Sequence, residues 1–202
     1  MAMLDRFYLI VDSFDWIERL IPAGVRLVQL RIKERPEVDV RRQVREAKVF
    51  CAAHGAQLIV NDYWEIALDE GCDFIHLGQG DLDTADLKKL RSAGIRVGIS
   101  THDRAELERA LVAGPDYVAL GPIYPTRLKQ MPWAPQGLGR ITEWKRLIGN
   151  LPLVAIGGIT AERAPRCLAA GADCTAVVSD IIANKDPVAR TLAWIAATKA
   201  AP

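Results

Sequence analysis

The segment Ala23–Lys33 reads AGVRLVQLRIK. It opens with Ala-Gly, which is typical of a helix end, and continues with an apolar run that finishes in polar residues. The same order, a glycine followed within three residues by an apolar run, recurs in HGAQLIV, EGCDFIHL, AGIRVGI, AGPDYVAL and AGADCTAVV. Runs that are apolar throughout, rather than alternating, indicate strands of a parallel sheet that is covered on both faces.

Two further runs, FYLIVD and LVAIGG, bring the number of expected strands to eight. We predict these strands at Phe7–Asp12, Leu27–Ile32, Gln57–Val60, Phe74–Leu77, Arg96–Ile99, Tyr117–Leu120, Leu153–Ile156 and Thr175–Val178. Segments with helical periodicity lie between them, and they include Val38–Ala53, Thr84–Ala93, Arg104–Ala113 and Ala161–Ala170. This pattern predicts an α/β fold, a single (β/α)8 TIM barrel over residues 1–202, whose active site lies where the strands end.

Composition excludes several classes of partner. The 202 residues carry a net charge of +1, so we expect no nucleic-acid or membrane surface that depends on bulk charge. No apolar stretch reaches the roughly 18 residues of a membrane span, and the first residues lack the pattern of a secretion signal. The four cysteines have no metal-like spacing and indicate small buried side chains in a reducing, cytoplasmic setting. A homo-oligomer stays open, and would form through an exposed apolar helix face.

Two carboxylates follow neighbouring strands. Asp62 comes directly after LIVN, and Asp81 comes after FIHLGQG. Acidic side chains at adjacent strand ends are suited to share one Mg²⁺, which commonly takes one or two carboxylates together with water and substrate phosphate. The alternative is that each aspartate caps the helix that follows it.

Basic side chains surround the same end of the barrel. Arg31 and Lys33 alternate along the second strand, beside Gln29, and Lys129 lies on a long loop. Unpaired charge is costly near a barrel interior, so these residues favour a strongly anionic ligand. Structural ion pairs with carboxylates such as Asp62 are the alternative.

A second anion site is indicated by AIGGIT after the seventh strand and VVSD after the eighth. Barrels of this kind frequently bind a phosphate monoester with the loops after these two strands. Glycines such as Gly158 allow backbone N–H groups to approach the phosphate. Two anion sites with a metal between them predict two phosphorylated small-molecule substrates.

The remaining candidates are two histidines and a loop. His76 lies inside an apolar strand and is interpreted as a hydrogen-bonded core residue, whereas His102 follows GIST and is a candidate acid/base. No Ser/His/Asp or Cys/His arrangement indicates a protein nucleophile. The long segment Gly121–Pro152 begins with a Pro- and Gly-rich stretch, which predicts a loop that closes over the site.

Taken together, the blocks QLRIK, ND, HLGQGD, GIST-H, GPIYPT-x-x-K, IGGI and VVS resemble the thiamine-phosphate synthase family, to which thiazole tautomerases are related. The resemblance covers nearly the whole chain. It implies a (β/α)8 barrel that joins a hydroxymethylpyrimidine diphosphate to a thiazole phosphate and releases pyrophosphate. In such enzymes the diphosphate is expected to leave first, and the thiazole nitrogen then captures the pyrimidine-stabilised cation.

The resemblance also implies a role for each matching residue. The pyrimidine diphosphate would be held by Gln29, Arg31, Lys33, Asn61, Ser100 and Lys129. The thiazole phosphate would be held by Thr126, Gly158, Val178 and Ser179. Asp62 and Asp81 would bind Mg²⁺, and the loop Gly121–Gly139 would close to exclude water.

Three positions depart from the family pattern. Leu128 stands where the family has a second Thr, Ile32 where Glu is common, and Tyr63 where a basic residue is common. Two alternative functions therefore stay open. A thiazole tautomerase would use His102 as acid/base and would need no diphosphate site, and a non-catalytic barrel would bind thiazole phosphate without turnover.

Overall fold

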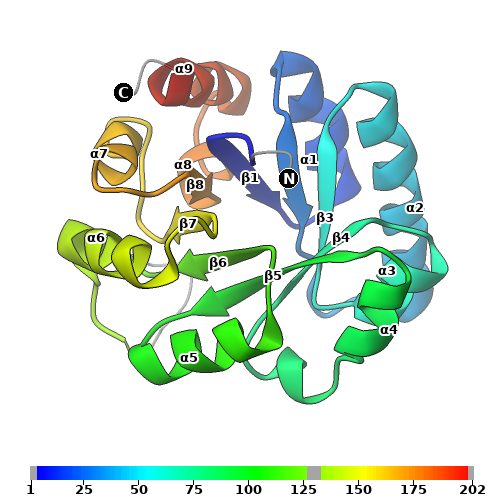
Figure 1. Cartoon of the computed structure of the whole chain (residues 1–202). Coiled ribbons are helices and arrows are strands. Elements are labelled where there is room, and N and C mark those ends of the chain that lie inside the picture. Colours follow the sequence, from blue (N-terminus) through cyan, green and yellow to red (C-terminus); the bar gives the residue numbers. More distant parts are fainter. Residues whose placement is uncertain (1–3, 127–132, 200–202) are drawn as a thin grey trace.

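Eight parallel strands close into one barrel (Figure 1). The computed structural model describes residues 4–126 and 133–199. The strands are β1 (Phe7–Val11), β2 (Leu27–Leu30), β3 (Gln57–Asn61), β4 (Phe74–Leu77), β5 (Arg96–Thr101), β6 (Tyr117–Leu120), β7 (Leu153–Ile156) and β8 (Cys174–Val177). Each strand pairs with the next in sequence, and β8 pairs with β1. The predicted TIM barrel is confirmed, and the strand ends differ from the expected ones by at most two residues. That residues 1–202 form one domain stays a prediction.

The helices surround the barrel on its outside (Figure 1). They are α1 (Phe14–Leu20), α2 (Glu37–Ala53), α3 (Trp64–Asp69), α4 (Leu87–Ser92), α5 (Arg104–Ala113), α6 (Gly137–Ile148), α7 (Ala164–Ala169), α8 (Ser179–Ile182) and α9 (Pro187–Lys199). Two short 3-10 turns, η1 (Ile21–Ala23) and η2 (Asp81–Asp83), precede β2 and α4. Helix α4 begins later than predicted because the Asp86 side chain caps it, accepting a hydrogen bond from Lys89 N at 2.9 Å.

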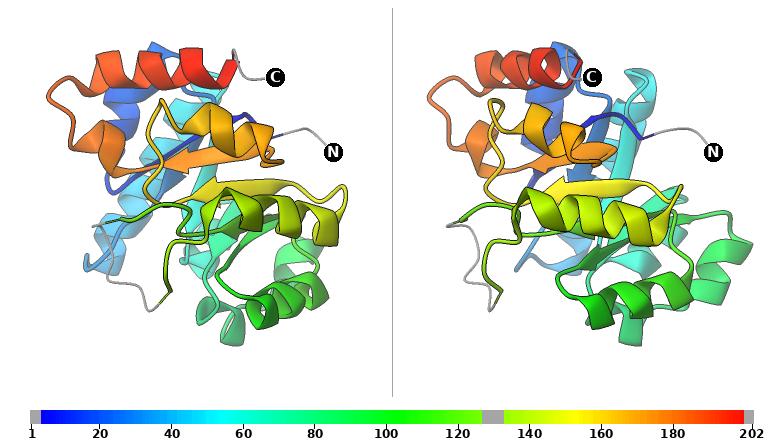
Figure 2. Two further views of the ribbon diagram at one scale, coloured as in Figure 1. Left: turned by 90° about the vertical axis from the view of Figure 1, so that its left-hand side faces the viewer. Right: turned by 60° about the vertical axis from the view of Figure 1, so that its left-hand side comes forward.

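The carboxyl ends of the strands meet at one end of the barrel. Figure 2 shows the arrowheads of β7 and β8 pointing the same way, toward the end where α8 lies. All the loops that follow a strand start at this end, because parallel strands share one direction. It is therefore the end where polar side chains from distant parts of the sequence meet.

Apolar side chains form two layers. The inner layer fills the barrel and consists of Tyr8, Ile10, Leu27, Ile59, Phe74, Tyr117, Ala119, Val154, Cys174 and Ala176. The outer layer joins the strands to the helices, and Trp144 and Trp194 are fully buried in it. Both layers follow from strands that are buried on two faces, as the uniform apolar runs predict.

Gly98 on β5 makes room for a large inner side chain. A Cβ atom at this position would lie 2.1 Å from two ring carbons of Tyr117, which is itself fully buried. Gly98→Ala is therefore expected to lower the free energy of unfolding by about 1–3 kcal/mol, because neither ring nor strand has space to move. Urea unfolding measures this change. The matched variant Gly139→Ala in α6, where no atom lies within 4 Å, is expected to leave stability unchanged or raise it. Equal stability of the two variants would contradict this account.

The four cysteines are free and buried, as predicted. Burial raises the pKa of the Cys51 thiol to about 12 and that of the Cys72 thiol to about 11. A thiol held in this protonated form is a small hydrophobic side chain rather than a nucleophile. Among the described helices, none has the length and apolar character needed to cross a membrane.

Candidate functional site

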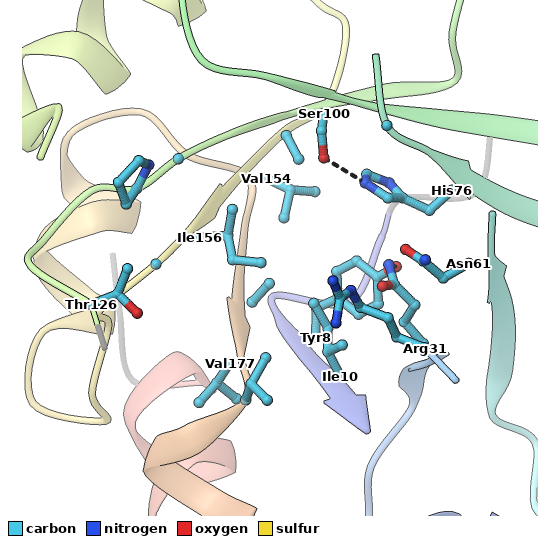
Figure 3. Close-up of a pocket in the computed structure, with 18 of the residues that line it drawn as sticks. Tyr8, Ile10, Arg31, Asn61, His76, Ser100, Thr126, Val154, Ile156 and Val177 are labelled. Carbon is cyan, nitrogen blue, oxygen red and sulfur yellow. Dashed lines mark hydrogen bonds between the residues drawn. The ribbon is translucent and has the colours of Figure 1, made fainter. Parts of the chain in front are cut away.

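A cavity of about 680 Å³ opens at the carboxyl end of the strands. Its lining includes twelve of the site residues named from the sequence: Gln29, Arg31, Lys33, Asn61, Asp62, Asp81, Ser100, His102, Thr126, Gly158, Val178 and Ser179. Lys129, the thirteenth, lies outside the described residues. Side chains that are up to 150 positions apart in sequence thus share one cavity, since every strand contributes its carboxyl end (Figure 3).

The two aspartates lie side by side. Asp62 follows β3 with a φ of 63°, a backbone conformation in which Asp is one of the commoner non-glycine residues. The Asp81 carboxylate accepts a hydrogen bond from Gly78 N at 3.0 Å. Burial, and next the negative charge of Asp62, raise the pKa of Asp81. Neither carboxylate caps the following helix, so the alternative of simple helix caps does not hold.

The basic residues lie just beyond β2. Lys33 forms an ion pair with Asp62, so the structural ion pair that the sequence left open exists at this position. Its side chain is still 50% exposed, which leaves its ammonium group accessible from the cavity. Arg31 lines the cavity on the same side as Asn61 and Tyr8 (Figure 3). Positive and negative side chains therefore lie close together at this end of the cavity. An anion bound together with a divalent cation would find basic groups for the anion and carboxylates for the cation.

Two departures from the family pattern have a structural explanation. Ile32, where the family commonly has Glu, is 2% exposed and packs in the outer apolar layer. Tyr63 packs partly against the same layer. Both side chains therefore contribute apolar packing at these positions. Leu128 lies outside the described residues.

His76 is a hydrogen-bonded buried residue, as predicted, but it also lines the cavity. Its Nε2 lies 2.8 Å from Ser100 Oγ, and its Nδ1 lies 2.7 Å from the Tyr117 hydroxyl. Burial lowers the pKa of His76 to about 4, so the ring is neutral at pH 7. The Tyr117 hydroxyl in turn lies 3.1 Å from that of Tyr8, which accepts a hydrogen bond from Gln29 Nε2 at 2.7 Å.

His102 is held by its neighbours. Its backbone N and its Nδ1 both lie 2.7 Å from Glu106 Oε2, and its ring stacks on Trp133 with centroids 4.1 Å apart. Gln136 Nε2 donates to its carbonyl oxygen at 2.6 Å. Glu106 and Trp133 were missed in the sequence. The spacing of four residues between His102 and Glu106, one helical turn, was the available signal for the first.

Glycines shape the opposite end of the cavity. Gly158 has a φ of 65°, and a Cβ atom there would lie 2.4 Å from Pro125 O and 2.8 Å from Tyr124 O. The loop after β7 therefore touches the loop after β6, which carries Thr126. Val178 and Ser179 reach the same end from β8. Backbone from three loops converges here, as an oxyanion-binding site requires.

Arg190 on α9 links two of these loops. It donates to the Glu162 carboxylate at 2.7 and 2.8 Å and to the Asp180 carboxylate at 2.8 and 3.1 Å. The Asp180 carboxylate also accepts from Trp194 Nε1 at 2.7 Å. Glu162 follows the β7 loop and Asp180 follows Ser179, so one guanidinium holds both loops.

Arg190→Ala is expected to lower the free energy of unfolding by about 1–3 kcal/mol, because it leaves the mostly buried Asp180 without its cation. Thermal or urea unfolding measures the change. The matched variant Arg104→Ala removes an ion pair with Glu108 in which the two side chains are 56% and 63% exposed, and we expect less than about 1 kcal/mol there. An Arg190 effect no larger than that of Arg104 would disprove the structural role.

Comparisons with known proteins agree with the resemblance that the sequence motifs carry. A family model described as thiamine monophosphate synthase matches residues 7–181. Thiamine-phosphate synthase of Rhizobium etli is 65% identical over 195 residues, which cover 96% of both chains. That of Salmonella typhimurium is 48% identical over 179 residues, covering 89% of this chain and 85% of the relative. A solved thiamine phosphate pyrophosphorylase from Pyrococcus furiosus superimposes with a TM-score of 0.85 over 96% of each chain, at 23% identity, and supports the fold.

Neither the tautomerase nor the non-catalytic barrel is favoured, since these relatives are named as synthases. The family match covers most of the chain, and the residues from which the resemblance was stated line one cavity. The chain is therefore an enzyme of the transferase class and belongs to the thiamine monophosphate synthase family.

Proposed function

We propose that this chain joins 4-amino-5-hydroxymethyl-2-methylpyrimidine diphosphate to a thiazole phosphate, giving thiamine phosphate and pyrophosphate. One observation carries the proposal: a single cavity of about 680 Å³ has a mixed-charge end at Arg31, Lys33, Asp62 and Asp81 and a glycine-rich end at Gly158. A diphosphate with its cation suits the first end, and a phosphate monoester suits the second.

The pyrimidine diphosphate would lie against β2 to β5. Gln29, Asn61 and Ser100 offer hydrogen bonds to a heterocycle, and Arg31 and Lys33 offer positive charge to the diphosphate. The Lys129 side chain stays a predicted contact of the same group. The thiazole phosphate would bind the backbone near Gly158, Val178 and Ser179, with Thr126 beside it.

Asp62 and Asp81 fit a magnesium ion. Their carboxylates are close enough for the charge of Asp62 to raise the pKa of Asp81, and a divalent cation would relieve that repulsion. Oxygen ligands from two carboxylates, completed by water and diphosphate oxygens, are what Mg²⁺ prefers. When bound, Mg²⁺ would supply positive charge to the leaving diphosphate.

The reaction needs no protein nucleophile. The bond between the pyrimidine methylene carbon and the diphosphate oxygen breaks, and its electron pair leaves with pyrophosphate. Arg31 and Lys33 would stabilise the charge that develops on that oxygen. The thiazole nitrogen then donates its lone pair to the methylene carbon and forms the new C–N bond. The apolar wall at Ile10, Val154 and Ile156 would limit the access of water to the cation (Figure 3).

Release of pyrophosphate tests the proposal. The purified chain is incubated with both substrates, with and without Mg²⁺, and with each substrate alone. We expect release that requires the thiazole phosphate and Mg²⁺ together. A folded protein that binds thiazole phosphate but releases no pyrophosphate would rule the reaction out.

We also propose where in the cell the enzyme acts. Four unpaired, buried thiols suit a reducing compartment, and we expect the enzyme in the cytoplasm. Its partners would be the two phosphorylated substrates.

A further inference from the structure

Five polar groups form one continuous chain beneath the cavity. It runs from the Gln29 amide through the hydroxyls of Tyr8 and Tyr117 to the His76 ring and ends at Ser100 Oγ. The groups come from five different strands: β2, β1, β6, β4 and β5. Figure 3 shows the last link, in which His76 and Ser100 face each other at the edge of the cavity. We call these five hydrogen-bonded groups the relay.

The direction of the hydrogen bonds follows from the donors and acceptors. Gln29 Nε2 donates to the Tyr8 hydroxyl oxygen, so the Tyr8 proton is free to serve Tyr117. With the Tyr8 proton directed at the Tyr117 oxygen, His76 Nδ1 is the acceptor that the described residues leave for the Tyr117 proton. A neutral imidazole that accepts at one nitrogen carries its proton on the other, so His76 Nε2 donates to Ser100 Oγ.

The direction of these hydrogen bonds determines how Ser100 presents its hydroxyl group to the cavity. Its oxygen accepts from His76, which directs its own hydroxyl proton toward another acceptor. No acceptor for that proton is recorded among the described residues, and Ser100 lines the cavity. A ligand atom that faces Ser100 is therefore offered a hydrogen bond, and a ligand donor placed there would leave the Ser100 proton without an acceptor. In the reverse direction the Tyr8 proton would have no acceptor among the described residues unless the Gln29 amide turned over.

We propose that Tyr8, Tyr117 and His76 are specificity-determining residues, which hold Ser100 as a hydrogen-bond donor and so select a pyrimidine ring nitrogen that has a lone pair. This inference rests on the proposed function, because it assigns the pyrimidine to the Ser100 side of the cavity. A neutral 4-aminopyrimidine has lone pairs on both ring nitrogens. The 4-oxo analogue carries a hydrogen on the ring nitrogen next to the oxo group, and with this nitrogen facing Ser100 it would place a donor against a donor. In that orientation the relay would disfavour the deaminated substrate.

The three groups behind Ser100 are buried, so water does not replace a hydrogen bond that one of them loses. Tyr8 and Tyr117 are each 1% exposed or less, and His76 is 7% exposed. A hydroxyl that cannot rotate its proton without breaking a buried hydrogen bond cannot adapt to a ligand of the wrong polarity. A mismatched ligand therefore loses more binding free energy there than at an exposed hydroxyl.

The first test reads the His76 tautomer and needs no turnover. A long-range ¹H–¹⁵N correlation spectrum of the chain, which has three histidines, is assigned with His76→Gln. We expect Nε2 protonated and Nδ1 bare in the wild type, and loss of that preference in Tyr117→Phe. A wild-type ring protonated at Nδ1 would overturn the proposal, whether or not the proposed reaction is observed.

The second test compares kcat/KM for the 4-amino and 4-oxo pyrimidine diphosphates. We expect Tyr117→Phe to narrow the preference for the amino substrate by at least about tenfold, because His76 Nε2 can then accept the Ser100 proton and the Ser100 oxygen can accept from the ligand. The matched control is Tyr124→Phe, which removes a buried tyrosine hydroxyl that lies outside the relay and has only the Cys167 thiol as a weak partner among the described residues. An unchanged preference in Tyr117→Phe, with the wild type active, would overturn the relay alone. A wild type without activity would instead overturn the proposed function.

Discussion

Asp62→Asn and Asp81→Asn are each expected to lower kcat/KM by about 100-fold or more, because each removes a negative charge from the proposed Mg²⁺ site. The loss should be partly recovered at high Mg²⁺ concentration if the charge acts by holding the cation. Steady-state rates of pyrophosphate release over a range of Mg²⁺ concentrations measure both effects. Since Asp81 is partly buried beside a like charge, Asp81→Asn is expected to unfold at the same or a higher urea concentration than the wild type.

Asp73→Asn is the matched control. Asp73 lies at the amino end of β4, at the other end of the barrel from Asp81, and pairs with Arg96 at 2.9 Å. Its side chain is 65% exposed, so we expect little change in activity or in Mg²⁺ dependence. Full activity of both cavity variants at limiting Mg²⁺ would exclude these carboxylates as the metal ligands.

Gly158→Ala is expected to raise KM for the thiazole phosphate by about 10- to 100-fold, with a smaller effect on KM for the pyrimidine diphosphate. The added Cβ would lie 2.4 Å from Pro125 O and 2.8 Å from Tyr124 O, so the loops after β6 and β7 must separate. A shift of about 1 Å in a group that holds substrate is enough for a loss of this size. Initial rates with each substrate varied in turn give the two constants.

Gly94→Ala is the matched control, which separates the effect of backbone strain from the effect of a displaced loop at the cavity. Gly94 also has a positive φ, +75°, but no atom lies within 4 Å of its Cβ position, and it is remote from the cavity lining. It should lose stability, as any alanine with positive φ does, without a change in either KM. Equal KM values for Gly158→Ala and the wild type would remove Gly158 from the phosphate site.

Strand positions were predictable because the buried strands are mostly apolar on both faces and, apart from β1, follow a glycine near the end of the preceding segment. In β6, Tyr117–Leu120, and β7, Leu153–Ile156, prediction and structure agree at both ends. Helix starts were harder. The start of α4 depends on which of several polar residues caps it, and Asp86 is one of many capable side chains in that segment.

The shared cavity was predictable for the same reason as the fold. Residues that follow parallel strands must meet at one end, so Asp62 and Gly158 could be placed together from sequence order alone. Tyr8 and Tyr117 could not be assigned to the site. Inside an apolar run, a tyrosine that packs and a tyrosine that joins a hydrogen-bonded chain have the same sequence pattern.

By itself, the sequence determined the barrel, the end of the barrel that binds ligands and the residues present there. Those properties depend on local periodicity and on strand direction, which neighbouring residues encode. Only the tertiary structure decided which groups pair across the barrel: Lys33 with Asp62, Arg190 with Glu162 and Asp180, and the relay from Gln29 to Ser100. Such pairs depend on distances between strands and helices that are far apart in sequence, and barrel closure sets those distances.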